Sequence, residues 1–235
     1  MKRIFLTTSV LLLFILLSWL LWPLAGEQYH IEWDASAIAK KQQTLSQLSI
    51  DTNADRPNIM IILVDDLGKM DFPLYGGNDI VKTPNIERMA AQGVVFNRAY
   101  VSSPVCSPSR AALLTGRYQQ RFGYQNQLHD RYLTNRFEYF GFKWFVNSHP
   151  WVPKWMDDVP NEEDIMKQGL PPSEITLPEV LQQAGYKTGL VGKWHLGWSE
   201  DNKPCNFGLD YQYGFYASHS LYAHENTPGI IEWDA

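Results

Sequence analysis

The stretch PNIMIILVDDLG, residues 57–68, changes the character of the chain and decides its fold class. Residues 57–64 form a nearly continuous apolar run rich in isoleucine, which is typical of a strand buried on both faces of a parallel sheet. The run ends at two adjacent carboxylates, Asp65 and Asp66, where a strand of this kind meets the ligand-binding edge of its sheet. We therefore expect the folded domain to begin at residue 57.

Two further units of helix followed by strand lie downstream. Residues 83–93, TPNIERMAAQG, carry a threonine cap, a proline in the first turn and a closing glycine, which predict a helix before a strand at 94–100. A capped helix at 176–185 and a strand at 186–192 repeat this order. Residues 109–115 indicate a short helix between the two units. Strands that alternate with helices predict an α/β fold with ligands at the carboxyl ends of the strands.

The composition is that of one globular domain. The chain has 235 residues, of which 45% are apolar and 14% aromatic, so it can bury a sizeable core. Its formal net charge of -5 argues against a nucleic-acid binder, because phosphate recognition needs a basic field. The two cysteines, Cys106 and Cys205, do not make a disulfide framework, although the sequence leaves a bridge between them open.

The N-terminus has the pattern of an export signal. Two basic residues precede an apolar stretch at about 4–22, close to the roughly 20 residues that span a bilayer. A signal anchor that stays in the inner or plasma membrane is favoured over a cleaved peptide, with the remainder periplasmic or extracellular. We assign residues 1–26 to this signal, 27–56 to a polar linker or stalk, and 57–235 to the folded domain.

The segment at 125–172 is aromatic and irregular, and it includes Trp144, Trp151 and Trp155. We expect these tryptophans to pack an insertion onto the body of the protein, because aromatic side chains contribute heavily to cores. A platform on which sugar rings stack is the alternative interpretation.

Two pairs of residues with chemical potential follow predicted strands. Asp65 and Asp66 offer the oxygen ligands that hard divalent cations prefer, although an acidic pair on its own is more often a solvated turn. Lys193 and His195 place a cation and an imidazole at the same sheet edge, where a lone histidine is more often structural. Their coincidence at one edge favours a functional site.

Cys106 lies at the start of the apolar helix. The helix that begins after Pro108 is expected to present unpaired N–H groups and a positive dipole end, and Arg110 can fork towards an oxyanion. These surroundings favour an anionic tetrahedral ester as ligand. They would also stabilise a thiolate, so a thiol nucleophile stays open from first principles.

The run CSPSRAALLTG, residues 106–116, resembles the signature of the type I sulfatases, in which the cysteine is oxidised after translation to formylglycine. Four more motifs in the same order extend the resemblance over about 57–220: PNI to DDLG in the first strand, TPNI at 83–86, GKWHLG at 192–197 and GLDYQYG at 208–214. The resemblance implies an alkaline phosphatase-like α/β fold, in which a central mixed sheet carries helices on both faces.

The resemblance also implies the roles of the first group of site residues. Asp65, Asp66 and the modified residue at Cys106 would bind a divalent cation, calcium or alternatively magnesium. One hydroxyl of the hydrated aldehyde would attack sulfur with the help of the metal, and Arg110 would stabilise the hydrate.

A second group would handle the sulfate. Lys193 would neutralise charge on the sulfate and the leaving oxygen, and His195 would hydrogen-bond the second hydroxyl and help to expel sulfate. Ser218 is implied as a further sulfate contact. Pro108 and Arg110 also belong to the sequence that a formylglycine-generating enzyme recognises, which makes that enzyme an expected partner.

The implied activity is that of a sulfuric ester hydrolase acting on a sulfated carbohydrate or an aryl sulfate. A phosphonate or phosphodiester hydrolase of the same superfamily and a silent anion-binding protein are the alternatives. Sulfatases are usually much longer, and their later part supplies metal ligands that cannot be placed here. We therefore expect an N-terminal part of such an enzyme, incomplete in its C-terminal strands, that turns over sulfate esters poorly by itself.

Overall fold

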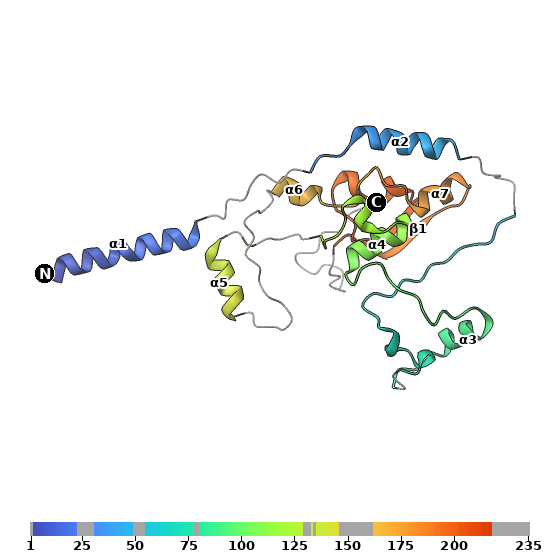
Figure 1. Ribbon diagram of the computed structural model, residues 1–235, viewed down its shortest axis with the longest axis horizontal. Coiled ribbons are helices and arrows are strands. Elements are labelled where there is room, and N and C mark those ends of the chain that lie inside the picture. Colours follow the sequence, from blue (N-terminus) through green and yellow to red (C-terminus); the bar gives the residue numbers. More distant parts are fainter. Residues whose placement is uncertain are drawn as a thin grey trace.

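The computed structural model describes residues 2–22, 31–48, 55–77, 80–128, 133, 135–145 and 162–217. The helices are α1 (Lys2–Leu21), α2 (Ala35–Ser46), α3 (Pro84–Gln92), α4 (Cys106–Thr115), α5 (Arg136–Phe145), α6 (Glu162–Lys167) and α7 (Leu177–Gln183). Two strands, β1 (Gly189–Lys193) and β2 (Tyr211–Phe215), form a parallel pair with Gly189 opposite Tyr211. Figure 1 shows α4, α7 and β1 together in the body, with α1 at one extreme and α3 in a separate lobe.

Three helices form where their boundary residues predict them. Helix α3 has its proline in the first turn, and α7 begins with a capping box in which Glu179 accepts hydrogen bonds from the backbone N–H and hydroxyl of Thr176. Helix α4 ends at Gly116, whose left-handed backbone (φ 64°) suits a residue without a Cβ. It starts three residues before the predicted 109–115, at Cys106. The strand predicted at 186–192 is confirmed as β1.

The core lies where α4 meets the loops around β1 and β2. Trp194 is 2% exposed, and its indole N–H donates to the carbonyl of Asn202 over 2.9 Å. Phe207 packs against Trp194 with ring centroids 5.8 Å apart. The buried cluster is completed by Ala111, Tyr124, Leu128, Leu170, Leu196 and Leu209. This packing fixes the end of β1 and the first turn of α4 relative to each other.

The strands predicted at 57–64 and 94–100 are wrong for this structure. The apolar side chains of residues 59–64 are between 48% and 85% exposed. Within the described part of the chain, β1 and β2 have only each other as strand neighbours, so the apolar run has no sheet to join. It is held at its start, where the Tyr186 hydroxyl donates to the Pro57 carbonyl over 3.1 Å.

The segment expected to be a linker contains a packed helix. In α2, Lys41 is 4% exposed and lies 2.6 Å from a carboxylate oxygen of Glu179 on α7. The same ammonium lies 5.0 Å from the centre of the Phe207 ring, and Leu45 is 6% exposed on the same helix. Helix α2 is therefore fastened to the body through a buried cation and an apolar contact.

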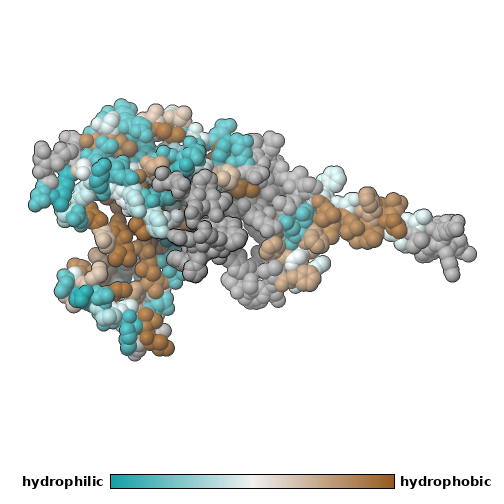
Figure 2. Space-filling view, turned by 180° about the vertical axis from the view of Figure 1, so that it is seen from behind, coloured by the Kyte–Doolittle hydropathy of each residue, from teal (hydrophilic) through white to brown (hydrophobic). Residues whose placement is uncertain are grey.

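Helix α1 exposes its apolar side chains. From Val10 to Trp22, the large apolar residues other than the half-buried Leu20 are 45% to 69% exposed, and Figure 2 shows a mostly hydrophobic surface along this helix. Over the described residues, we find no helix with the length and apolar character needed to cross a membrane. Export and anchoring stay predictions.

The aromatic insertion is described in part. Arg136 at the start of α5 donates a hydrogen bond to the Trp19 carbonyl over 3.3 Å, and its guanidinium lies 4.9 Å from the centre of the Trp19 ring. Trp144 stacks on Phe140 but is 65% exposed, so it does not pack into the body as expected. The other two tryptophans of the insertion, at 151 and 155, lie outside the described residues.

Candidate active site

The two carboxylates occupy a tight turn. Asp65 and Asp66 follow the apolar run directly, and Asp66 adopts the left-handed backbone region (φ 53°). Aspartate tolerates this region better than most residues because its short side chain can hydrogen-bond locally. Both residues are exposed, as a solvated turn requires.

Cys106 joins these carboxylates from α4. One ligand atom each of Asp65, Asp66 and Cys106 can be chosen so that all three atoms lie within 4.8 Å of one another. Residues 41 positions apart in the chain thus meet at one point, as the sequence predicts for a metal site. Two carboxylates suit a hard divalent cation, which prefers oxygen ligands. The donor set therefore fits calcium or magnesium, and residue 106 would lie beside such an ion.

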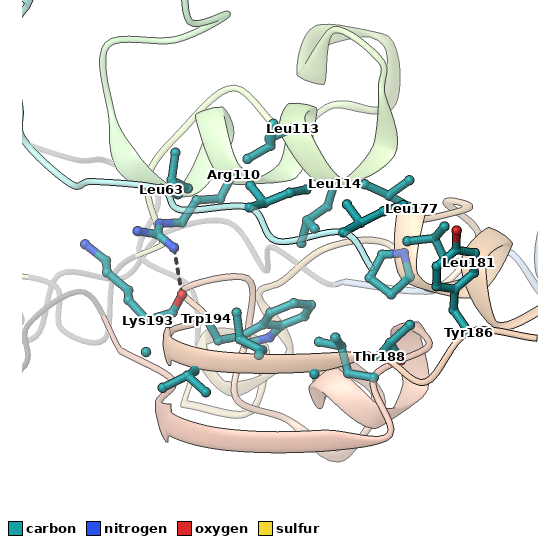
Figure 3. A pocket seen from close by; sticks show the side chains of 18 of the residues that line it. Leu63, Arg110, Leu113, Leu114, Leu177, Leu181, Tyr186, Thr188, Lys193 and Trp194 are labelled. Atoms are coloured by element: carbon teal, nitrogen blue, oxygen red, sulfur yellow. Dashed lines mark hydrogen bonds between the residues drawn. The ribbon is translucent and has the colours of Figure 1, made fainter. Parts of the chain in front are cut away.

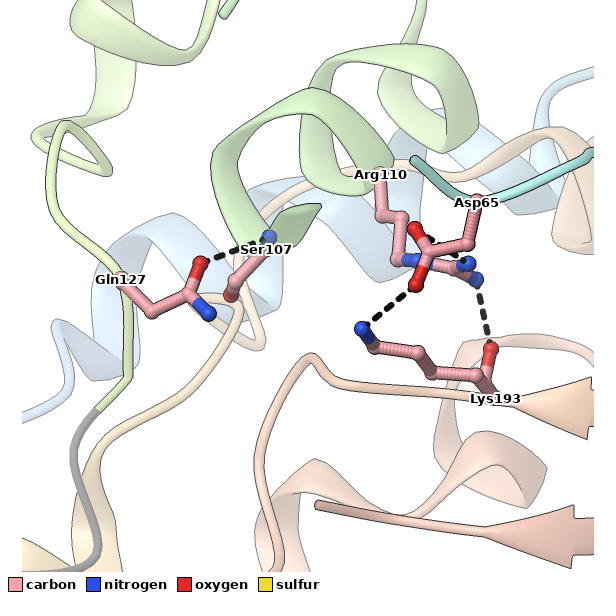
Figure 4. A network of polar contacts seen from close by, with 5 residues as sticks. All are labelled: Asp65, Ser107, Arg110, Gln127 and Lys193. Carbon is pink, nitrogen blue, oxygen red and sulfur yellow. Dashed lines mark hydrogen bonds and ion pairs between the residues drawn. The ribbon is translucent and has the colours of Figure 1, made fainter. Parts of the chain in front are cut away.

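Two cations meet the same carboxylate (Figure 4). Lys193, at the end of β1, places its ammonium 2.7 Å from one oxygen of Asp65, and Arg110 places its guanidinium 3.4 Å from the other. Arg110 also donates to the Lys193 carbonyl over 2.7 Å, which ties α4 to the end of β1. The cationic side chains are 9% and 12% exposed, against 39% for Asp65. The site is therefore a positively charged wall around a half-exposed carboxylate.

These contacts set the protonation state of Asp65. Partial burial on its own would raise the pKa of this carboxyl. The hydrogen bond and charge of Lys193, followed by the charge and hydrogen bond of Arg110, more than offset burial and hold the pKa below its usual value. Asp65 is therefore ionised at neutral pH, which is the state that a metal ligand requires, with its two oxygens in contact with Lys193 and Arg110.

The remaining predicted residues are placed less directly. His195 is fully buried and has a left-handed backbone (φ 56°), and its backbone N–H donates to the Tyr216 carbonyl over 3.1 Å. It lies two residues after Lys193, just beyond the strand. Ser218 lies outside the described residues.

A cavity of about 660 Å³ adjoins the two cations (Figure 3). Its walls are mostly apolar and come from the 59–64 run, α4, α7 and β1; they include Leu63, Leu113, Leu114, Leu177, Leu181 and Tyr186. Asp65, Arg110 and Lys193 line it at one end. The cavity occupies the space between the apolar run and β1.

Two residues beside the site, Tyr124 and Gln127, gave no signal in the sequence. Ser107 is fully buried next to Cys106, and its hydroxyl lies 2.7 Å from the hydroxyl of Tyr124. Burial raises the pKa of Tyr124, although its bond to Ser107 opposes this, so the phenol stays neutral. The backbone N–H of Ser107 donates to the side-chain oxygen of Gln127 over 3.4 Å. No motif singles out Gln127, because its role depends on a turn of chain 20 residues away.

Comparison with known proteins gives a consistent match. The profile of the Sulfatase family matches residues 57–234. Arylsulfatase H of Canis lupus familiaris is 38% identical over 189 residues, which cover 77% of this chain and 29% of that protein. N-acetylgalactosamine-6-sulfatase of Homo sapiens is 37% identical over 183 residues, which cover 76% of this chain and 30% of that protein.

A solved structure shows the same likeness in space. The crystal structure of Ps i-CgsB aligns with a TM-score of 0.53 and 33% identity, over 69% of this chain and 29% of the other. The chain thus spans less than a third of the length of each of these three relatives.

Proposed function

Because the chain belongs to the sulfatase family, we propose that it carries the nucleophile, half of the metal site and the sulfate-binding cations of a sulfuric ester hydrolase. The observation that supports this most is the meeting of Cys106 with Asp65 and Asp66 within 4.8 Å. In this proposal Cys106 is oxidised to formylglycine by the formylglycine-generating enzyme. One hydroxyl of the hydrated aldehyde is the nucleophile that takes up the sulfate, and loss of the proton from the second hydroxyl re-forms the aldehyde and expels the sulfate from the first.

The proposed substrate is a sulfated carbohydrate or an aryl sulfate. The relatives named above are called an arylsulfatase and an N-acetylgalactosamine-6-sulfatase, so both substrate classes occur among similar proteins. A sulfate group brings negative charge to a wall where Arg110 and Lys193 are mostly buried. Two such cations bind a tetrahedral anion more strongly at a site shielded from water than on an open surface.

The side chains of the site divide the work by position. Lys193 would neutralise the sulfate and the oxygen that leaves with the alcohol. Arg110 would orient the hydrate from the side of α4, since its contacts to Asp65 and the Lys193 carbonyl hold the guanidinium in place. His195 would accept the proton of the second hydroxyl as sulfate leaves.

A divalent cation fits between Asp65, Asp66 and residue 106. Such an ion, when bound, lowers the pKa of a neighbouring hydroxyl and draws charge from the sulfate. Asp65 and Asp66 would hold the ion, and the ammonium of Lys193 balances the negative charge of Asp65 when no ion is bound.

Replacing Asp65 by asparagine should weaken calcium binding by at least about 10-fold, because a charged oxygen ligand becomes a neutral one. Isothermal calorimetry with calcium chloride measures this change. Asp55→Asn is the matched control, since Asp55 is exposed and lies before the apolar run. Equal calcium affinity in the Asp65 and Asp55 variants would show that Asp65 and Asp66 form a solvated turn and not a metal site.

The proposed nucleophile is tested by mass spectrometry of protein made together with a formylglycine-generating enzyme. We expect the peptide around Cys106 to carry the aldehyde or its hydrate, since the CSPSR run is intact. Turnover of a matched aryl sulfate and aryl phosphodiester then separates the proposed sulfatase from a phosphodiester hydrolase. A free thiol at Cys106 in every preparation would remove this mechanism.

A further inference from the structure

The first turn of α4, which carries Cys106, has no cap of its own. The N-cap residue is Val105, whose side chain cannot accept a hydrogen bond. Pro108 has no N–H, and the N–H of Ser109 already donates to the Val105 carbonyl over 3.2 Å. Only the N–H groups of Cys106 and Ser107 are left for a partner outside the helix.

The segment that carries Tyr124 and Gln127 makes hydrogen bonds to Ser107. The side-chain oxygen of Gln127 accepts the Ser107 N–H over 3.4 Å, as Figure 4 shows. The Tyr124 hydroxyl meets the Ser107 hydroxyl at 2.7 Å inside the core. Tyr124 and Leu128 are each 7% exposed, so the segment that bears Gln127 is anchored on both sides of it. Ser107 is thus hydrogen-bonded through both its backbone N–H and its hydroxyl.

We infer that Gln127 is a positioning residue for Cys106, acting as a remote cap that holds the first turn of α4 in register with Asp65 and Asp66. A first helical turn without a cap frays, and fraying here would move residue 106 away from the carboxylates. Gln127 prevents this by supplying the acceptor that Val105 lacks. The effect on turnover rests on the proposed function, whereas the capping itself does not.

The choice of an amide suits this location. A carboxylate would cap the helix more strongly, but it would add a third negative charge near Asp65 and Asp66. Glutamine accepts the Ser107 N–H and stays neutral. The capping also bears on the anion site that the sequence predicts at this helix end. Because Pro108 has no N–H and the N–H of Ser107 is engaged, a bound sulfate would be held mainly by side chains rather than by backbone N–H groups.

The test uses the unmodified chain with Cys205 replaced by serine, so that Cys106 is the single thiol. Gln127→Ala and Gln127→Leu remove the acceptor, Gln127→Glu keeps it, and Gln125→Ala changes the same residue type at an exposed site in the same segment. Two readouts apply: hydrogen exchange of the Ser107 amide, and the rate at which iodoacetamide alkylates Cys106 in the folded protein.

We expect Gln127→Ala and Gln127→Leu to speed both exchange and alkylation by about fivefold, as the loss of one cap predicts. Gln127→Glu should restore the protection of the Ser107 amide, and Gln125→Ala should match the parent. The inference is overturned if Gln127→Ala and Gln125→Ala behave alike, or if Gln127→Glu fails to rescue.

A third arm uses protein in which Cys106 has been converted. There Gln127→Ala should lower kcat by about 10-fold and leave KM nearly unchanged, because a displaced nucleophile affects the chemical step more than binding. An unchanged kcat would show that the cap does not position the nucleophile. The proposed function fails separately if Cys106 is never converted to the aldehyde, while exchange and alkylation still decide the capping role.

Discussion

Replacing Cys106 by alanine is expected to reduce hydrolysis of an aryl sulfate by on the order of 10³-fold or more, as removal of a covalent nucleophile does in other hydrolases. Alanine cannot be oxidised to an aldehyde, so both hydroxyls of the hydrate are lost together. The measurement is turnover of the aryl sulfate by protein made with a formylglycine-generating enzyme, together with aldehyde labelling of the same preparation.

Cys205→Ala is the matched control for this variant. Cys205 is exposed and unpaired, and it lies outside the site. The control should keep both the aldehyde label and the parental turnover. Comparable turnover in the two cysteine variants would show that the reaction does not pass through residue 106.

The largest expected loss of stability comes from Lys41. Changing Lys41 to methionine keeps the apolar stem but removes the buried partner of Glu179, and the free energy of unfolding should fall by about 3 kcal/mol. The two side chains are 3% and 9% exposed, so water cannot replace the lost charge. Urea unfolding followed by circular dichroism measures the difference.

Lys40→Met separates this effect from a general change in helix charge. Lys40 is exposed on the same helix, and its variant should lie within about 0.5 kcal/mol of the parent. Adding Glu179→Gln to Lys41→Met should recover part of the loss, because the amide oxygen can still serve the capping box of α7. Equal stabilities of the Lys40 and Lys41 variants would contradict a structural role for the buried pair.

The helices could be predicted because their signals are local. The first-turn prolines of α3 and α7, the capping box of α7 and the closing glycine of α4 lie within a few residues of the boundaries that they set, whereas Thr83 makes no side-chain cap hydrogen bond at the start of α3. The strand at 57–64 failed for the opposite reason. Its apolar pattern predicts a strand with both faces buried. A strand also needs neighbouring strands with which to hydrogen-bond, and a local pattern does not show whether these are present.

The packing of α2 was missed on similar grounds. A lysine in a polar segment ordinarily indicates solvent, and only the fold shows that Lys41 meets Glu179 and the Phe207 ring. Two partners more than a hundred residues away are needed to bury that charge. The sequence therefore pointed to a linker where the structure has a fastened helix.

The site itself was assembled in part from sequence. Asp65, Asp66 and Cys106 come together as their motifs predict. The bond from Arg110 to the Lys193 carbonyl and the grip of Gln127 on Ser107 were not predictable, because each joins side chains to backbone across long stretches of chain. The motifs identify the reactive side chains, whereas these contacts determine the positions of those side chains in the site.

The burial of the first turn of α4 limits when a modifying enzyme can reach Cys106. Ser107 and Ala111 are fully buried, Pro108 is less than 2% exposed, and Arg110 is held by its two partners. A modifying enzyme that must read these residues cannot reach them in the folded domain. If Cys106 is converted as proposed, conversion and folding compete, and the share of chains that carry the aldehyde depends on how long the nascent segment stays accessible to the enzyme. A chain that folds before it is modified would be correctly folded but would lack the aldehyde, and it would stay inactive.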